Sequence, residues 1–202
     1  MSSLSKQSTH LQRTKKLSWS KFMTSFKSLS DKEFTALFYD FQTSAFRLET
    51  LQLYAVDYEE IPFKDFMQGK ERYTHAVQSE YIDMVSKHVN SGRSMSRVHI
   101  ISEPLSDYVR FEILWPYADN VQAGEDVRLL PIKQNNWPEN IPKEDFWIFD
   151  SKLVAVMNYD HEGRFLEAKL LHESHDIEKY LEIEESAVRS SIPYDVYVRN
   201  IK

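Results

Sequence analysis

The chain has 202 residues, 42% of them hydrophobic, and a formal net charge of −6. This length suits one domain, which at this composition can bury a substantial core. The absence of cysteine excludes disulfides, thiolate metal ligands and a cysteine nucleophile. It also fits a reducing compartment, so we expect a cytoplasmic protein. No apolar run approaches the roughly 18 residues that a membrane span needs, so we expect no membrane association.

The charge is unevenly distributed along the chain. Residues 1–30 hold six basic residues and no acidic one, which leaves −12 for residues 31–202 (−6 minus +6). Because an acidic body repels phosphates, we expect it not to bind nucleic acid directly. The basic, Ser-rich arm at 1–30 is predicted to be partly disordered, with a transit peptide as the alternative. Residues 31–202 are predicted to form a single domain.

The first predicted element is a helix that begins at Ser30. Ser30 and Glu33 have the spacing of a capping box, and the apolar residues that follow fall on one helical face. Residues 44–56 alternate between apolar and polar and predict a strand. Helical spacing returns within residues 63–91, where a glycine follows as the terminator.

The middle of the chain predicts a strand–helix–strand unit. Residues 97–101 are a short continuous apolar run, typical of a buried strand. Ser106 can cap a helix that Pro116 kinks or divides, and residues 127–131 predict the next strand. If these strands are parallel, the crossover should be right-handed.

The last third predicts a hairpin over residues 145–160, a further strand after the turn at 160–163, and a helix over 177–188. The order of strands and helices predicts an α/β or α+β fold, with helices flanking a mixed sheet.

Charged residues gather near the predicted strand ends, where ligands of α/β proteins usually bind. Three arginines there could bind an anion, or the group could brace the strand ends as an ion-pair network, which we favour. Arg47 and Glu49 are two apart on a strand and share a face. The candidate ligand-binding residues are Arg47, Glu49, Arg110, Glu112, Glu125, Arg128 and Asp150.

Asp150 has two interpretations. It could orient a phosphate-binding group, or it could form the hairpin turn with Ser151 and Lys152, where aspartate bonds nearby backbone N–H groups. We favour the turn.

Catalytic and metal motifs are absent from the sequence. No G-x-S-x-G elbow, phosphate-cradling glycine loop or H-E-x-x-H occurs, so we assign no catalytic residue and no cofactor. His172 and His175 could ligate a metal only if they shared a helical turn with a converging carboxylate. Their segment, HESHD, predicts a loop instead, and we assign no metal site.

Four segments occur in a recognisable order: FRLET (46–50), EPLSDYVRFE (103–112), AGEDVR (123–128) and DFWIFD (145–150). Together they resemble DUF6879, an uncharacterised family of actinobacterial proteins, over residues 34–195. The resemblance implies no established activity. Members are often encoded beside helix-turn-helix regulators, which implies a regulatory protein partner.

The layout also resembles half of a phospholipase D-type domain, whose motif is His-x-Lys followed by Asp. Aligning Asp150 with the motif aspartate puts Lys143 at the histidine and Asp145 at the lysine position. The resemblance therefore implies a degenerate domain without its nucleophile. We predict a non-enzymatic interaction or ligand-sensing protein that acts with a transcriptional regulator. The alternative is a phosphodiesterase or nuclease of altered mechanism, with His99 or His161 as nucleophile.

Overall fold

The computed structural model describes residues 27–73, 79–133 and 136–201. The strands are β1 (Lys27–Leu29), β2 (Ser44–Glu49), β3 (Ser94–Glu103), β4 (Asp126–Lys133), β5 (Asp145–Phe149), β6 (Leu153–Tyr159), β7 (Phe165–Leu171) and β8 (Ile192–Pro193). The helices are α1 (Asp31–Asp40), the 3₁₀ helix η2 (Asp57–Glu59), α2 (Glu60–Met67), α3 (Ser79–Asn90), α4 (Asp107–Leu114), α5 (Pro116–Ala123), α6 (Ser174–Ser190) and α7 (Tyr194–Ile201).

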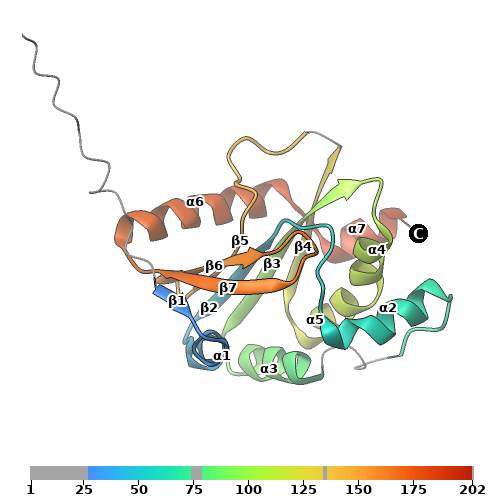
Figure 1. The fold of residues 1–202 in the computed structure, drawn as a ribbon, viewed down its shortest axis with the longest axis horizontal. Helices are drawn as coiled ribbons and strands as arrows, with labels where there is room; N and C mark the ends of the chain where they lie inside the picture. Colours follow the sequence, from blue (N-terminus) through green and yellow to red (C-terminus); the bar gives the residue numbers. More distant parts are fainter. Residues whose placement is uncertain (1–26, 74–78, 134–135, 202) are drawn as a thin grey trace, which may run out of the picture.

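The strands form one 8-stranded mixed sheet in the order β1-β7-β6-β5-β2-β3-β4-β8, with helices on both faces (Figure 1). This arrangement confirms the predicted fold class. The parallel strands β2, β3 and β4 lie side by side, and the β3–β4 pair confirms the predicted strand–helix–strand unit as parallel. The antiparallel strands β5, β6 and β7 extend the sheet from β2.

Local sequence signals explain several boundaries. Ser30 and Glu33 form the predicted capping box at the start of α1. Ser106 accepts a hydrogen bond from Val109 N–H and caps α4. Pro116 is the first residue of α5, where a proline needs no N–H partner, so it divides the predicted helix in two.

Other boundaries differ from the sequence prediction. The strand predicted over 44–56 ends at Glu49, and Thr50 instead donates hydrogen bonds to Asp145 from its backbone N–H and its hydroxyl. The helical pattern within 63–91 belongs to two helices, α2 and α3. The short strands β1 and β8 and the helix α7 were not predicted. Of the predicted arm, Lys27–Leu29 pairs with β7, and residues 1–26 lie outside the described residues.

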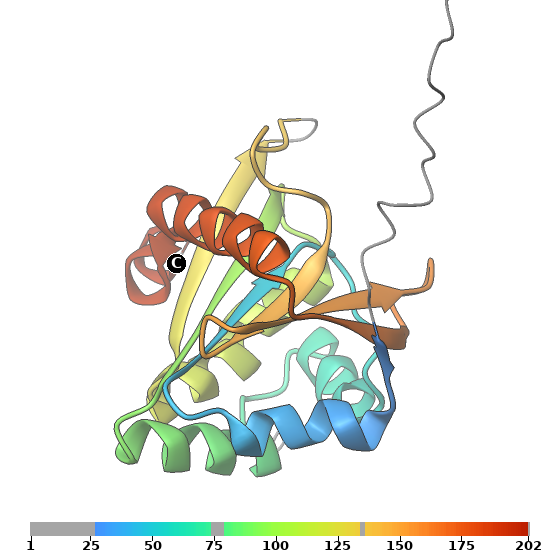
Figure 2. The same ribbon diagram turned by 90° about the vertical axis from the view of Figure 1, so that its left-hand side faces the viewer.

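The two faces of the sheet carry different cores. The face with Phe46, Leu48 and Val98 packs against α6 and is almost wholly apolar. The opposite face is covered by α1 and α3 towards β5, and by α4 and α5 towards β4 (Figure 2). Because side chains alternate along a strand, Arg47 and Glu49 point to this second face, as predicted.

Candidate functional site

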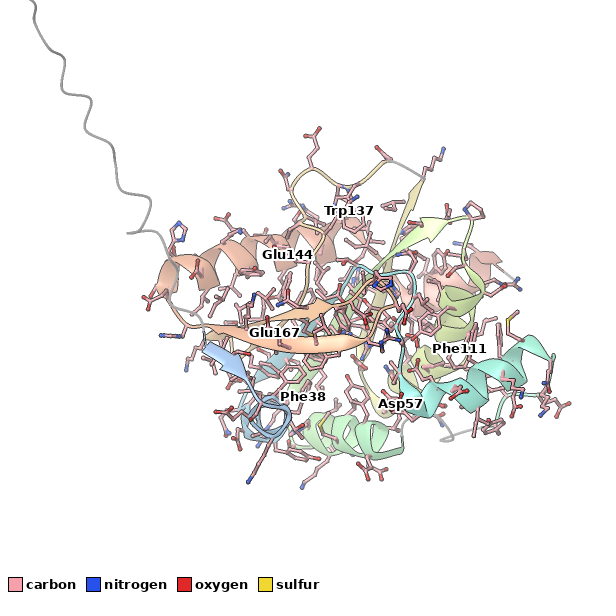
Figure 3. The ribbon with its side chains drawn as sticks, viewed as in Figure 1. Phe38, Asp57, Phe111, Trp137, Glu144 and Glu167 are labelled. Atoms are coloured by element: carbon pink, nitrogen blue, oxygen red, sulfur yellow. The ribbon has the colours of Figure 1, made fainter. Side chains whose placement is uncertain are left out.

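A cavity of about 250 Å³ lies between the second face of the sheet and the helices that cover it. Arginine, glutamate and aromatic side chains make up most of its wall, and we call it the polar cavity. Its charged and tyrosine lining residues are Arg47, Glu49, Tyr54, Tyr58, Glu59, Tyr81, Arg97, Tyr108, Glu112 and Tyr159. Apolar side chains from α1, β5, β6 and β7 also line the cavity, among them Phe38, which Figure 3 labels: Phe34, Phe38, Trp147, Met157 and Phe165.

Arg97 is held by acids on both sides. Its Nε donates to Glu125 Oε1 at 2.7 Å, its Nη1 donates to Glu49 Oε2 at 3.0 Å, and its Nη2 donates to the Tyr81 hydroxyl at 2.8 Å. Its Cζ lies 5.2 Å from the centroid of the Tyr117 ring. Arg97 is only 5% exposed, so these contacts replace the hydration of its guanidinium.

Arg47 lies beside Arg97 on the neighbouring strand. Its Nε is 2.9 Å from Glu49 Oε1, and its Nη2 donates to the Tyr159 hydroxyl at 3.3 Å. Its Cζ lies 5.4 Å from the Trp147 ring centroid and 5.7 Å from that of Tyr54. Stacking of this kind suits the weakly hydrated, planar guanidinium. Glu49 is therefore shared between two arginines.

A chain of hydrogen bonds continues from Glu49 into the core. The Tyr117 hydroxyl donates to Glu49 Oε2 at 2.9 Å and lies 2.7 Å from His99 Nδ1. His99 Nε2 lies 2.7 Å from the carbonyl oxygen of Leu51. His99 is fully buried, and both of its ring nitrogens have a partner.

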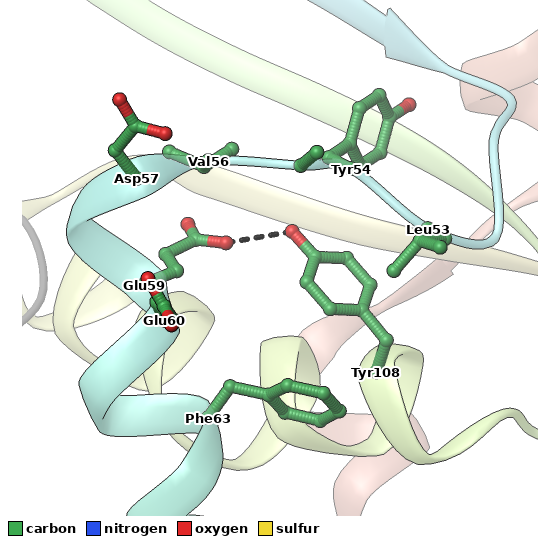
Figure 4. Close-up of a pocket in the computed structure, with 9 residues that line it drawn as sticks. Leu53, Tyr54, Val56, Asp57, Glu59, Glu60, Phe63 and Tyr108 are labelled. Carbon is green, nitrogen blue, oxygen red and sulfur yellow. Dashed lines mark hydrogen bonds between the residues drawn. The ribbon is translucent and has the colours of Figure 1, made fainter. Parts of the chain in front are cut away.

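On the helical side, two carboxyl groups meet at one hydroxyl. The Tyr108 hydroxyl lies 2.7 Å from Glu59 Oε2 and 3.3 Å from Glu112 Oε1. Figure 4 shows the Glu59–Tyr108 contact in the wall of a second, outer pocket of about 220 Å³. This outer pocket shares Tyr54, Glu59 and Tyr108 with the polar cavity and reaches Phe63 of α2.

The surroundings shift the pKa values of Glu49 and Glu112 in opposite directions. Burial alone would raise the pKa of Glu49, but the charges of Arg47 and Arg97 outweigh it and lower the pKa to about 2. Burial, together with the charges of Glu59 and Glu49, raises the pKa of Glu112 well above its ordinary value. The cavity therefore combines a Glu49 whose pKa is lowered with a Glu112 whose pKa is raised.

Burial also shifts the pKa values of two further groups, Asp145 and His99, in the direction that favours the neutral form. Burial raises the pKa of Asp145, although the charge of Arg47 and hydrogen bonds from Thr50 and Tyr54 oppose it. Burial lowers the pKa of His99, against the charge of Glu49. The Leu51 carbonyl can only accept, so the proton of a neutral His99 is on Nε2, and His99 Nδ1 competes with Glu49 for the single proton of the Tyr117 hydroxyl.

The structure brings together four of the seven predicted site residues. Arg47, Glu49 and Glu112 line the polar cavity, and Glu125 lies behind it, bound to Arg97. The interpretation as an ion-pair network holds for Arg47, Glu49 and Glu125.

Arg110 and Arg128 do not converge on this site. Arg110 lies exposed on α4. Arg128 is in register with Val98, whose side chain faces α6, so Arg128 lies on the opposite face of the sheet. There it donates to the hydroxyl and the carbonyl of Ser191. Arg47, Arg110 and Arg128 therefore do not form a common anion site, and this interpretation is wrong.

Asp150 is a turn residue, as favoured. Asp150 and Ser151 have φ values of 55° and 53°, the left-handed values that the residues of a tight hairpin turn require. The Asp150 carboxylate accepts the backbone N–H groups of Gln42, Thr43 and Ser44. It lies beside the start of β2, whereas Glu49 is at the end of that strand, so Asp150 does not join the polar cavity.

Sequence reasoning missed Arg97, Tyr108 and Glu59. Arg97 was hidden at the start of an apolar run, although its spacing from His99 gives the two residues a common strand face. Tyr108 lies within the segment 103–112 that resembles the family, but the candidate residues were chosen by charge and a tyrosine is neutral. Glu59 had no signal, because its η2 segment lies in a crossover without periodicity.

Lys143 and Asp145, the residues aligned with the histidine and lysine of the phospholipase D motif, lie in different surroundings from one another. Lys143 Nζ is 5.2 Å from the ring centroid of Trp137, in the loop labelled in Figure 3. Asp145 is buried and accepts hydrogen bonds from Thr50 and Tyr54.

His172 and His175, the two histidines considered as metal ligands, lie at the surface. The side chains of His172 and His175 are 51% and 92% exposed. Within residues 27–73, 79–133 and 136–201, no three His, Cys, Asp or Glu side chains converge in a way that could hold a metal ion. None of the helices in these ranges is long and apolar enough to cross a membrane.

The fold and the site define a mixed α/β protein with a buried, aromatic-lined polar cavity. The chain belongs to the family described as a domain of unknown function, DUF6879, whose model matches residues 32–199. This match confirms the family resemblance. No curated protein matches the sequence.

Among solved structures, one similar fold is that of TrmBL2, described as an archaeal chromatin protein with a novel mode of DNA binding. The identity is 9% and the TM-score 0.46, over 87% of this chain and 56% of that one. No functional argument follows from a similarity at this level.

Proposed function

We propose that the protein is a non-enzymatic ligand sensor in which a small polar molecule occupies the polar cavity. The observation that supports it is the cluster of buried ionisable groups around that cavity. Burying charge is unfavourable, and an apolar core of the same shape is often as stable or more stable. Such clusters with shifted pKa values concentrate at functional sites. The cavity also reaches the surface, since Tyr58 and Phe165 in its lining are 56% and 36% exposed.

Ligand binding in the cavity can be tested with the small molecules extracted from the cells that produce the protein. Adding this extract should raise the melting temperature of the wild-type protein, because a ligand that binds only the folded state stabilises it. Ala55 lines the cavity and is exposed, so Ala55→Trp should narrow the entrance and reduce the shift. Leu166→Trp, on the exposed surface of β7, should leave it unchanged. Equal shifts in all three proteins would contradict the proposal.

The second half of the proposal is a protein partner, for which the family resemblance suggests a helix-turn-helix regulator in the cytoplasm. Support comes from exposed apolar side chains within residues 53–73, a stretch whose first part, Tyr54–Glu59, contributes to the cavity wall: Leu53, Tyr58, Ile61, Met67 and Tyr73. A ligand that contacts this segment from inside can alter the surface that it presents outside. The regulator encoded nearest should co-purify with the wild-type protein, and a double change Ile61→Asp, Met67→Asp should abolish this. Co-purification that survives the double change would contradict this surface.

The phosphodiesterase alternative has less support. His99 is enclosed with a partner on each ring nitrogen, and the side chain of His161 is 87% exposed. A phosphodiester would also meet the carboxyl groups of Glu49, Glu59 and Glu112 in the cavity wall. Hydrolysis of a generic phosphodiester that His99→Ala or His161→Ala abolishes would restore this alternative.

A further inference from the structure

The polar cavity holds more acids than bases. Two arginines and three glutamates line it, and Glu125 and Asp145, each 3% exposed, lie directly behind this lining. Two guanidinium groups therefore share a buried cluster with five carboxyl groups. A surplus of buried carboxyl groups is unfavourable unless protons or an external cation compensate it.

The positive charges of the cluster are confined to the sheet side. Arg97 is bound by Glu49 and Glu125, and Arg47 is in contact with Glu49. Both guanidinium groups also lie against aromatic rings, so each is fixed in place. Arg97 is thus hydrogen-bonded to two acids, whereas Arg47 forms an ion pair with Glu49 although its Nε makes no hydrogen bond.

The opposite wall, formed by η2 and α4, is acidic and aromatic. Glu59 and Glu112 approach the same Tyr108 hydroxyl, at 2.7 and 3.3 Å. Two carboxylates in such proximity repel one another, and burial together with the charges of Glu59 and Glu49 raises the pKa of Glu112. A cation in the cavity would relieve the same repulsion directly. An anion would increase it, and a neutral molecule would leave it unchanged.

The rings of this wall suit the same kind of ligand. Tyr58 and Tyr108 lie on the helical side, and Phe34 stacks on Phe165 with ring centroids 5.7 Å apart at the opposite rim. The negative faces of aromatic rings attract ammonium groups, with quaternary ammonium ions as a well-known case. The volume of about 250 Å³ lies below the usual range for drug-sized ligands, so the ligand is small.

We infer that the polar cavity binds a small organic cation, whose ammonium group lies between Glu112, Tyr108 and Tyr58. This inference rests on the proposed ligand-sensing function and adds the chemical class of the ligand. Metal ions are a poorer match, since no cluster of three ligating side chains is present in the described part of the chain.

Matched pairs of probes test the charge of the ligand. Choline and 3,3-dimethylbutan-1-ol have the same shape and differ by one positive charge, as do butylammonium and butan-1-ol in a primary series. At constant ionic strength, calorimetry should show millimolar or tighter binding of at least one cation. Its neutral counterpart should bind at least tenfold more weakly, and glucose and inorganic phosphate should not bind.

Variants locate the binding within the cavity. Glu112→Gln keeps the shape of the protonated side chain but cannot become negative, so it should weaken binding of the cation at least fivefold. Glu178→Gln makes the same change at an exposed position on α6 and should have no effect. Tyr58→Leu, at a side chain 56% exposed, removes a ring without disturbing the core and should also weaken binding several-fold. Undiminished binding in both cavity variants would overturn the inference.

The outcomes separate this inference from the proposed function. If glucose, phosphate or a neutral alcohol binds and the cations do not, the inference of a cationic ligand is wrong. The proposed ligand-sensing function would still hold. The same holds if the cell extract raises the melting temperature while no cation binds. If neither the cell extract nor any probe binds, both proposals fall.

Discussion

At the residue scale, Arg97 is the centre of the polar cluster. It contacts Glu49 and Glu125, all three residues are at most 5% exposed, and these carboxylates depend on it for compensation. Removing one partner of a buried ion pair leaves the other charge uncompensated, which is more damaging than replacing the whole pair.

Replacing Arg97 with Met should therefore destabilise the protein strongly. We expect the free energy of unfolding to fall by about 3–5 kcal/mol, measured by urea denaturation. Arg189→Met removes an exposed arginine that pairs with Glu185 one helical turn away, and it should have almost no effect. Equal effects of the two changes would contradict the assignment of Arg97 as a buried structural cation.

Glu112 should have the opposite effect on stability. Its pKa is raised in the folded state, so above the pKa of the unfolded chain, folding requires Glu112 to hold a proton or to carry a buried charge. Its contribution is neutral in acid and becomes unfavourable as pH rises. Glu112→Gln should thus raise the free energy of unfolding at pH 8 by more than at pH 4, measured by urea denaturation at both pH values. A uniform loss of stability at both would contradict the raised pKa.

Asp150 should confer the reverse pH dependence. Hydrogen bonds from three backbone N–H groups outweigh burial and lower its pKa in the folded state. A lowered pKa gives stability that is complete above the unfolded value and is lost as pH falls through the folded value. Asp150→Ala should cost about 1–3 kcal/mol at neutral pH and less in acid. An equal cost at pH 7 and pH 2 would show that the hydrogen bonds do not depend on the ionised carboxylate.

At the element scale, the segment from Tyr54 to Glu59 forms part of the cavity wall and is held by the β6–β7 hairpin. Ala55 N–H donates to the carbonyl of Gly163 at 3.0 Å. Gly163 has a φ of +81°, and a Cβ there would lie 2.5 Å from the Leu53 carbonyl oxygen. Only glycine allows the hairpin and the segment to approach so closely.

Gly163→Ala should therefore release this segment from the hairpin. We expect faster hydrogen exchange at the Ala55 amide, together with weaker ligand binding, because the cavity wall loses its support. Gly69→Ala is a matched control: Gly69 has a φ of +68° and nothing within 4 Å of the added Cβ. It should cost about 1–2 kcal/mol from backbone strain alone and leave exchange at Ala55 unchanged. Similar exchange in both variants would contradict the role of the close contact.

At the scale of the whole molecule, the sequence predicted the sheet and most of its helices because their signals are local. Capping at Ser30 and Ser106 and the proline at 116 mark helix boundaries without reference to the rest of the chain. β1 and β8 have three and two residues, too few for an alternating pattern, and they exist only because β7 and β4 offer edges.

The candidate site was predicted in part, for a related reason. Arg47 and Glu49 share a strand face, which spacing alone establishes, and both line the cavity. Whether Arg128 joins them depends on strand register: one position along β4 separates the cavity face from the α6 face. Glu59 lies in η2 and Tyr108 in α4, and the two meet only because of the path that the chain takes between β2 and α4. No local sequence pattern reports that path.

The central claim is that a small molecule occupies the polar cavity. A crystal structure of the protein with its tightest-binding probe tests this most directly. We predict density for one molecule between the arginines of the sheet and the acids of η2 and α4, in contact with Glu112 and Tyr108. A bound probe elsewhere on the surface, with the cavity filled only by water, would contradict the account.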